Sequence, residues 1–338
     1  MNDIEAKNII RSGEIIISHP PHIWKSFSTP KIMYIVFAVI LLPSAAGIYY
    51  FGLHSLYLML ASTGTAVLVE FIIRKSRKKN AFPDGSAAIT GLLLALTLPP
   101  RIPVWMAVIG SAFAIAIAKE AFGGLGHNIF NPALAGRAFL AICFPLKMTE
   151  WYQPGNFYGD ALTSATPLAK NYIYEGTKAA LYRDMFFGNI AGSIGETSAL
   201  VIILGGIILI ILKLIDWRIP LIYIGTVAAG AALFGQDIIF QVLAGGLMLG
   251  AFFMATDYVT SPMTPLGRCI FAAGAGIITL LIRRFGAMPE GVCFSILIMN
   301  AITPLIDKYV RIKPFGYKKE PVKKAAQKNT KNDKNRQQ

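Results

Sequence analysis

Three hydroxyl side chains within four residues mark the segment 160–168, which reads Asp-Ala-Leu-Thr-Ser-Ala-Thr-Pro-Leu. The segment has one carboxylate, no His and no Cys, and it lies in the longest polar interval between apolar runs. A set without a general base or a thiolate does not suit hydrolysis or metal binding. These hydroxyls therefore either form turns or serve as points of covalent attachment.

The densest polar stretch within the apolar region is 122–132, Phe-Gly-Gly-Leu-Gly-His-Asn-Ile-Phe-Asn-Pro. Glycines such as Gly123 and Gly124 let the backbone approach a ligand closely. Asn128 and Asn131 are three residues apart, so one face of a turn can present two amides to a flat ring with donors and acceptors. The alternative is a helix start, because Asn131 is a good N-cap and proline suits the next position. Both roles can coexist.

Other ionisable residues lie where a membrane protein usually places only apolar ones, and such groups tend to have a role. Lys119 and Glu120 form either a neutralised pair at a helix end or part of an ion path. Asp257 is either a turn residue where a span ends or a carboxylate lining a cation or proton route. The remaining polar candidates are His127, Arg137, Thr256, Arg268, Asn300 and Asp307.

The elements that position these residues are apolar helices. The 338-residue chain is 54% hydrophobic and 15% charged, against about 25% charged in soluble domains. Runs near 20 residues are long enough to cross a bilayer. We predict an all-α polytopic membrane protein with about ten transmembrane helices, some short or broken. The expected spans are 32–51, 56–73, 87–98, 104–122, 132–145, 199–215, 220–234, 238–255, 265–282 and 292–306.

The net charge is +14, and the basic residues cluster beside the spans, at 74–79 and in the tail after residue 309. This placement is typical of the positive-inside rule and not of a nucleic-acid-binding surface. An even number of spans puts a cytoplasmic segment 1–30 and a basic, disordered cytoplasmic tail 311–338 on one side. The loop 147–197 is then external. Arg101 and the pair Arg283–Arg284 fall outside in this topology, against the rule.

A weak internal repeat runs through the membrane domain 31–310. One offset relates Thr97 to Thr260, Phe122 to Phe285 (285 − 122 = 163) and Ala138 to Ala301. Five spans in each half would make the halves, about 31–145 and 199–308, insert with opposite orientation, as in many transporters. The alternative is coincidence among common residue types.

Several of these motifs together resemble those of a known protein family. Residues 119–124, 128–139, 253–257 and 299–307 resemble the family shared by the D-type subunit of the Rnf complex and the B-type subunit of the sodium-translocating NADH:quinone reductase. The resemblance covers about residues 18–310, and the modest length and the segment 18–23 are more similar to the Rnf member.

The resemblance implies FMN joined through its phosphate to a threonine hydroxyl within a motif similar to Asp-x-x-Ser/Thr-Gly-Ala-Thr. Thr166 is the implied attachment residue, and Ser164 stands where the family usually has Gly. The implied FMN motif comprises Asp160, Thr163, Ser164, Ala165, Thr166, Pro167 and Leu168. The resemblance also implies a second, noncovalent flavin, riboflavin, at Asn128 and Asn131, near Gly123 and Gly124.

The resemblance further implies an electron-transfer subunit in the cytoplasmic membrane, in a ferredoxin:NAD⁺ oxidoreductase complex that moves Na⁺ or H⁺. Implied partners are the flavoprotein G-type, membrane A- and E-type and peripheral B- and C-type subunits, with a flavin-attaching transferase. No glycine fingerprint for nicotinamide follows a strand. The rival hypotheses are a solute channel or permease without redox activity and a membrane scaffold. Flavin fluorescence that stays with the denatured chain is expected for the electron-transfer subunit and for neither rival.

Overall fold

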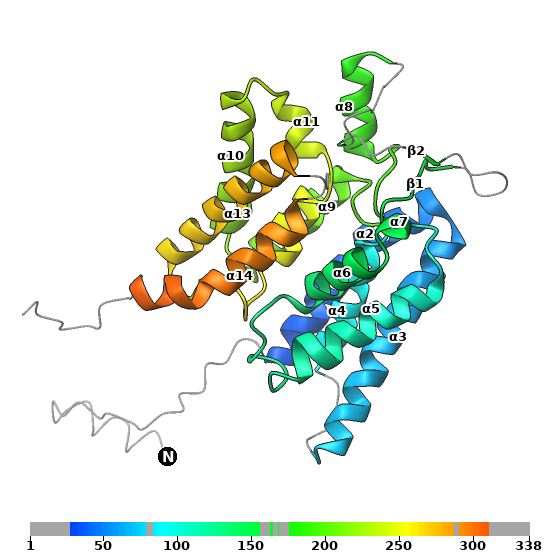
Figure 1. Ribbon diagram of the computed structural model, residues 1–338, viewed down its shortest axis with the longest axis vertical. Coiled ribbons are helices and arrows are strands. Elements are labelled where there is room, and N and C mark those ends of the chain that lie inside the picture. Colours follow the sequence, from blue (N-terminus) through cyan, green and yellow to red (C-terminus); the bar gives the residue numbers. More distant parts are fainter. Residues whose placement is uncertain are drawn as a thin grey trace, which may run out of the picture.

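The computed structural model describes residues 28–78, 84–155, 163–164, 168, 176–286 and 291–310. These residues are mostly helical (Figure 1). The expectations for the N-terminal segment and the basic tail concern residues outside these ranges, apart from residues 28–30. Asp160, Ala165, Thr166 and Pro167 also lie outside the described residues.

Within the described ranges, four helices are long and apolar enough to cross a membrane: α2 (Thr29–Phe51), α3 (Leu53–Ser76), α13 (Pro265–Phe285) and α14 (Val292–Tyr309). Helices of 18 to 24 residues span about 27 to 36 Å at 1.5 Å per residue. Shorter apolar helices are α4 (Ser86–Leu96), α5 (Val104–Ile115), α6 (Pro132–Cys143), α9 (Ala199–Ile211) and α10 (Arg218–Leu233). A multi-pass helical protein with short helices is confirmed.

The expected span 238–255 is not one helix, and this prediction was wrong. The structure divides it into α11 (Ile238–Leu243), α12 (Leu247–Leu249) and the π-helix η2 (Gly250–Met254). Gly245 interrupts it with a φ of +64°, a left-handed conformation that glycine adopts readily. The Arg283 guanidinium donates to the freed carbonyls of Gln241 and Ala244, at 2.6 and 2.8 Å. The backbone carbonyls freed by the break therefore accept hydrogen bonds from a side chain of α13.

A second π-helix, η1 (Ala116–Glu120), continues α5 and ends two residues before the end of the expected fourth span, 104–122. Single π-helical turns are rare and often occur at functional sites. Both π-helices are followed by non-helical segments that lead to a proline-started helix, α6 and α13 respectively. These two segments carry Asn128, Asn131 and Asp257.

The polar interval 147–197 contains short elements that the hydropathy pattern did not predict. The short helix α7 (Pro145–Met148) overlaps its start. Within it, strands β1 (Trp151–Tyr152) and β2 (Thr163–Ser164) pair antiparallel, and α8 (Lys178–Phe187) lies further along the chain. Tyr50, near the end of α2, accepts from the Gly155 N–H through its carbonyl and donates to the Phe187 carbonyl through its hydroxyl. One residue thus holds both sides of the interval.

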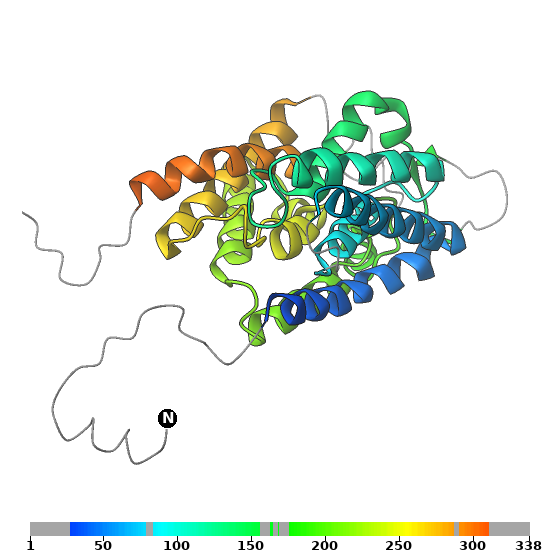
Figure 2. The ribbon, with the colours of Figure 1, turned by 90° about the horizontal axis from the view of Figure 1, so that it is seen from below.

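The helices form two groups that lie side by side, α2–α6 in blue to green and α9–α14 in green to orange (Figures 1 and 2). In the first group α3 packs on α4 and α5, and α5 on α6; in the second, α10 packs on α13 and α13 on α14. The groups meet where α2 contacts α9 and where α6 contacts α14. Helix α4 is buried along nearly its whole length between its neighbours, as a helix that is apolar on all sides should be.

Candidate functional site

A cavity of about 90 Å³ lies where the two helix groups meet, between α2, α4, α9 and the segments that follow η1 and η2. It brings together three residues singled out in the sequence, Asn128, Asn131 and Asp257, with the ammonium-bearing Lys119. Its wall is otherwise mostly apolar, with Ile89, Leu93 and Phe252 among the lining residues. An apolar cavity with a few convergent polar groups is the usual form of a small-molecule site.

Asn131 has a structural role in this wall. Its Oδ1 caps α6 by accepting from the backbone N–H groups of Ala133 and Leu134, at 3.0 and 3.4 Å. Its Nδ2 donates to the Met254 carbonyl at the end of η2, at 3.1 Å. The helix-start interpretation is therefore confirmed for Asn131, and its amide also joins the two helix groups.

Asn128 differs, because half of its amide has no partner. Its Nδ2 donates to the Phe130 carbonyl at 3.1 Å. Its Oδ1 is buried and has no hydrogen-bond partner among the described residues. A buried amide oxygen without a partner costs about 1–3 kcal/mol. Asn128 lines the cavity, so a ligand donor there would remove that cost.

Gly123 and Gly124 lie beside the cavity and not among the residues that line it. Their φ values are +124° and +100°, so they form the left-handed turn that ends η1. A Cβ on Gly124 would lie 3.3 Å from the Glu120 carboxylate. These glycines therefore shape the turn that presents Asn128.

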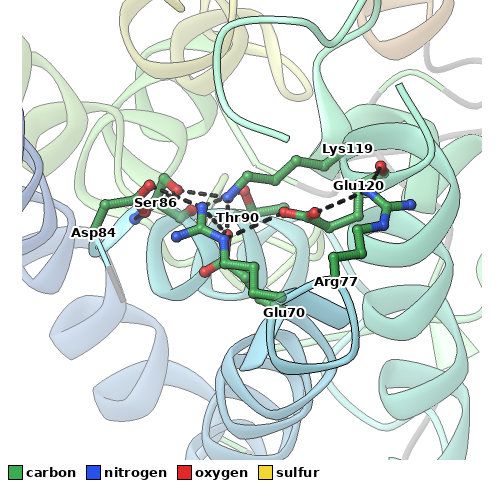
Figure 3. Close-up of polar contacts among 8 residues, drawn as sticks. Glu70, Arg77, Asp84, Ser86, Thr90, Lys119 and Glu120 are labelled. Carbon is green, nitrogen blue, oxygen red and sulfur yellow. Dashed lines mark hydrogen bonds and ion pairs between the residues drawn. The ribbon is translucent and has the colours of Figure 1, made fainter. Parts of the chain in front are cut away.

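Lys119 and Glu120 do not pair with each other, and the neutralised-pair interpretation was wrong. Consecutive residues of a helix point in different directions, so each finds partners on other elements (Figure 3). The Lys119 Nζ lies 2.6 Å from Glu70 Oε1 on α3 and 2.5 Å from the Ser86 hydroxyl at the start of α4. Lys119 and Glu70 are 1% and 2% exposed. The ion pair is fully buried beside the cavity.

Glu120 belongs to the other end of the same charged cluster. Its carboxylate lies 3.5 Å from the Arg74 guanidinium and 3.6 Å from that of Arg77. Arg74 also contacts Glu70 at 2.9 Å and Asp84 at 3.0 Å. The cluster, drawn in Figure 3, thus runs from the partly exposed Arg77 to the cavity wall at Lys119. Glu70 was missed in the sequence, although a lone carboxylate four residues before Arg74 in an apolar span was a visible signal.

Asp257 fulfils the turn interpretation and also lines the cavity. Its Oδ2 accepts from the Thr260 hydroxyl at 3.1 Å, and its carbonyl accepts from the Ser261 N–H at 3.2 Å. Its carboxylate shares the cavity with Lys119 and Asn128. The ion-path interpretation of Asp257 and Glu120 stays a prediction.

A second, smaller cavity lies at the end of the molecule that carries the loop 147–197. Leu168, from the predicted FMN motif, lines it with Met185 of α8, Glu196 and Gly245. Trp151 pairs with Ser164 and Tyr152 with Thr163 in the two-stranded sheet. Leu168 thus lies against α8 and the broken helix of the second group, whereas Thr163 and Ser164 pair with β1.

Two arginines lie near this smaller cavity, of which Arg137 is buried and Arg283 is partly exposed. Arg137 on α6 donates to the Thr97 carbonyl beyond the end of α4 and lies 3.6 Å from Glu196. Arg283, in the last turn of α13, fills the break between α11 and α12. Arg137 was among the sequence candidates, whereas the partnership with Glu196 was not predictable.

Comparison with known proteins identifies the family to which this sequence belongs. The profile of the NQR2, RnfD, RnfE family matches residues 16–316. The chain belongs to this family. The match includes all of residues 18–310, over which the sequence resembles this family, so the resemblance is confirmed.

Relatives in this family are similar along their entire length. The chain is 46% identical over 323 residues to the D-type subunit of the proton-translocating ferredoxin:NAD(+) oxidoreductase complex of Clostridium ljungdahlii, covering 91% of this chain and 98% of that protein. It is 46% identical over 316 residues to the D-type subunit of the Na(+)-translocating ferredoxin:NAD(+) oxidoreductase complex of Acetobacterium woodii, covering 92% and 98%. It is 36% identical to the D-type subunit of an ion-translocating oxidoreductase complex of Escherichia coli, covering 90% and 99%.

Proposed function

We propose that this chain is the D-type membrane subunit of an ion-translocating ferredoxin:NAD⁺ oxidoreductase complex and carries FMN covalently on Thr166. Its relatives of that name share 46% of its residues over nearly their whole length. The match of Asp160, Thr163, Ala165 and Thr166 to the flavin-attachment motif carries the covalent assignment. A flavin supplies the redox chemistry, and the chain supplies position and electrostatics.

We infer that the central cavity binds a second, noncovalent flavin ring, riboflavin. The unpartnered Asn128 oxygen fits a ring N–H, and Lys119 fits a ring carbonyl. Asn131, by joining α6 to η2, holds the two sides of the cavity at a constant separation. The apolar side chains of α4 and η2 exclude water from the ring.

The proposed topology is ten spans in two inverted five-helix repeats, with both termini in the cytoplasm and the FMN loop on the outer side of the cytoplasmic membrane. The 163-residue offset takes α3, α5 and α6 onto α10, α13 and α14, and the same pairs of helices pack together in both groups. The basic cluster at the end of α3 supports a cytoplasmic position for that end.

In this proposal FMN on Thr166 receives electrons from a flavoprotein G-type subunit at the outer face, after attachment by a transferase. The A-, B-, C- and E-type subunits complete the complex, and Asp257 and Glu120 lie on the Na⁺ or H⁺ path. Replacing Asp257 by Asn tests the path: Na⁺ and H⁺ uptake should fall relative to electron transfer. Unchanged uptake and electron transfer would remove Asp257 from it.

The covalent assignment is tested by flavin fluorescence in a denaturing gel. The protein is produced in its own host, so that the flavin-attaching enzyme is present. We expect a fluorescent band that is lost in Thr166→Val and kept in Thr163→Val. A dark wild-type band would overturn the proposal and favour the rival permease or scaffold, neither of which needs a covalent cofactor.

A further inference from the structure

We propose that Lys119 is the cationic contact of the ring in the central cavity: its ammonium donates to the ring and stabilises negative charge there. The inference rests on the noncovalent flavin of the proposed function and deepens it, because it gives the buried Lys119 an electrostatic role beyond that of a hydrogen-bond donor. Lys119 is a positioning and charge-stabilising residue that touches the cofactor, and not an acid or base in a reaction.

The first support is an unused donor. An ammonium has three N–H groups. Those of Lys119 have two acceptors among the described residues, Glu70 Oε1 at 2.6 Å and the Ser86 hydroxyl at 2.5 Å. Lys119 is also part of the cavity wall. The remaining N–H is therefore available to a molecule in the cavity.

The second support is an unused acceptor in the same cavity, the buried Asn128 Oδ1. A free donor and a free acceptor in one small apolar cavity fit a ring that presents a carbonyl beside an N–H. The pyrimidine-like edge of a flavin has this pattern of groups. A purely apolar ligand such as a lipid chain would leave both polar groups unpaired, at a cost of about 1–3 kcal/mol each.

The third support is the electrostatic position of the ammonium. Ser86 is the first residue of α4, so Lys119 lies at the positive end of that helix. A cation at a helix N-terminus is unfavourable, since both carry positive charge. The two together attract negative charge or electron-rich atoms to this part of the cavity wall.

The carboxylates around Lys119 are largely occupied by other cations. Glu70 Oε1 is shared with Arg74 at 2.9 Å, and Asp84 is also paired with Arg74. Glu120 faces Arg74 and Arg77. Asp257, on the opposite segment, is held by the Thr260 hydroxyl. Because these carboxylates are shared with other cations, part of the positive field at Lys119 reaches the cavity.

The test uses the purified complex with all its subunits. Acid-extractable flavin is quantified, and the midpoint potential of that flavin is titrated spectroscopically in wild type, Lys119→Met, Lys119→Arg and Glu70→Gln. In Lys119→Met the cation is lost, so the site should prefer reduced over oxidised flavin at least tenfold less than wild type does. A tenfold change lowers a two-electron midpoint potential by about 30 mV. Lys119→Arg should retain most of the wild-type potential.

Glu70→Gln should shift the midpoint potential of the flavin in the direction opposite to that of Lys119→Met. It removes a negative charge beside Lys119, so the potential of the extractable flavin should rise. A nonspecific loosening of the cavity would move Lys119→Met and Glu70→Gln in the same direction, toward the potential of free flavin. Lys147→Gln is the matched control, because Lys147 is half-exposed and pairs with Glu150; it should change neither flavin content nor potential.

The outcomes separate the two proposals. Fluorescence of the covalent FMN in the denatured gel should be equal in all variants, which shows that the protein is made and loaded. Wild-type complex without extractable flavin would overturn the noncovalent site and this inference together. Extractable flavin whose potential is unchanged in Lys119→Met, or shifts of the same sign in Lys119→Met and Glu70→Gln, would overturn the role of Lys119 alone.

Discussion

Asn131 joins two segments that are 123 residues apart in the chain, because its amide nitrogen donates to the Met254 carbonyl at 3.1 Å while its oxygen caps α6. The Asn131 backbone N–H in turn is within 3.0 Å of the Asn300 side-chain oxygen on α14. A single residue thus serves the local start of a helix and the contact between the two helix groups.

The two roles of Asn131 can be separated by substitution. Asn131→Asp keeps the capping oxygen but removes the donor to Met254, whereas Asn131→Ala removes both. We expect Asn131→Asp to destabilise the complex. Asn131→Ala should destabilise it by about 1 kcal/mol more, because the helix cap is lost as well. Thermal unfolding of the detergent-solubilised complex measures both changes. Wild-type stability in Asn131→Asp would contradict a contribution from the Met254 contact.

The buried pair Arg137–Glu196 should behave as a unit. Removing one partner leaves an uncompensated buried charge, at a cost of about 3 kcal/mol or more. We expect Arg137→Met and Glu196→Met each to be strongly destabilising and the double variant to cost clearly less than their sum. A double-mutant cycle from denaturation of the complex gives the coupling free energy. Strict additivity would argue that the 3.6 Å separation carries no significant interaction.

Gly91 on α4 and Gly64 on α3 form a matched pair of glycines in packed helices. A Cβ on Gly91 would lie 2.7 Å from the Ser62 carbonyl oxygen and 2.7 Å from the Thr63 Cα, backbone atoms that cannot move aside cheaply. Gly64 has nothing within 4 Å of the same atom. Gly91→Ala should cost about 1–3 kcal/mol from overpacking. Gly64→Ala should stay within about 0.5 kcal/mol in the isolated protein. Thermal unfolding of the two variants beside wild type measures the difference, and equal losses would contradict the close approach of α4 to α3.

The Asp84 carboxyl, just before α4, should make the stability of the folded protein depend on pH. Burial raises the pKa of this carboxyl, but the hydrogen bond from the Ser86 hydroxyl, the charge of Lys119 and the hydrogen bond from Arg74 outweigh it and hold the pKa below its ordinary value of 3.8. A lowered pKa in the folded state contributes stability that is complete above about pH 4 and is lost as the pH falls through the folded-state value.

Thermal unfolding between pH 7 and pH 3 measures this contribution. Wild type should lose stability below about pH 4 more steeply than Asp84→Asn, which lacks the titrating group. Parallel curves for the two proteins would show that other carboxylates account for the acid sensitivity.

Tyr50 should control the order of the described residues of α8 in the interval 147–197. Its hydroxyl donates to the Phe187 carbonyl at 2.7 Å at the end of α8. Tyr50→Phe removes this bond alone, so we expect little change in global stability but faster tryptic cleavage after Lys178 or Arg183 on α8. Limited proteolysis of the complex in detergent measures the rate. Equal cleavage rates would mean that the Tyr182–Asp237 contact suffices to hold α8.

Local patterns in the sequence predicted much of this protein. Hydropathy located the long apolar helices, and the short runs 87–98 and 132–145 became the short helices α4 and α6. The Asn131–Pro132 pair predicted the start of α6, because capping depends on adjacent residues only. The polar stretch 122–132 and Asp257 were recognisable since polar groups among apolar runs are costly.

Only the tertiary structure decided which partners the charged residues have. Lys119 binds Glu70, 49 positions away, and not its neighbour Glu120, because consecutive helical side chains diverge. Arg283 fills a helix break 39 to 42 positions away, which turned an expected continuous span into α11, α12 and η2. Hydropathy and periodicity report local preferences, whereas buried charges are stabilised by whichever partner the packing of distant helices brings within reach.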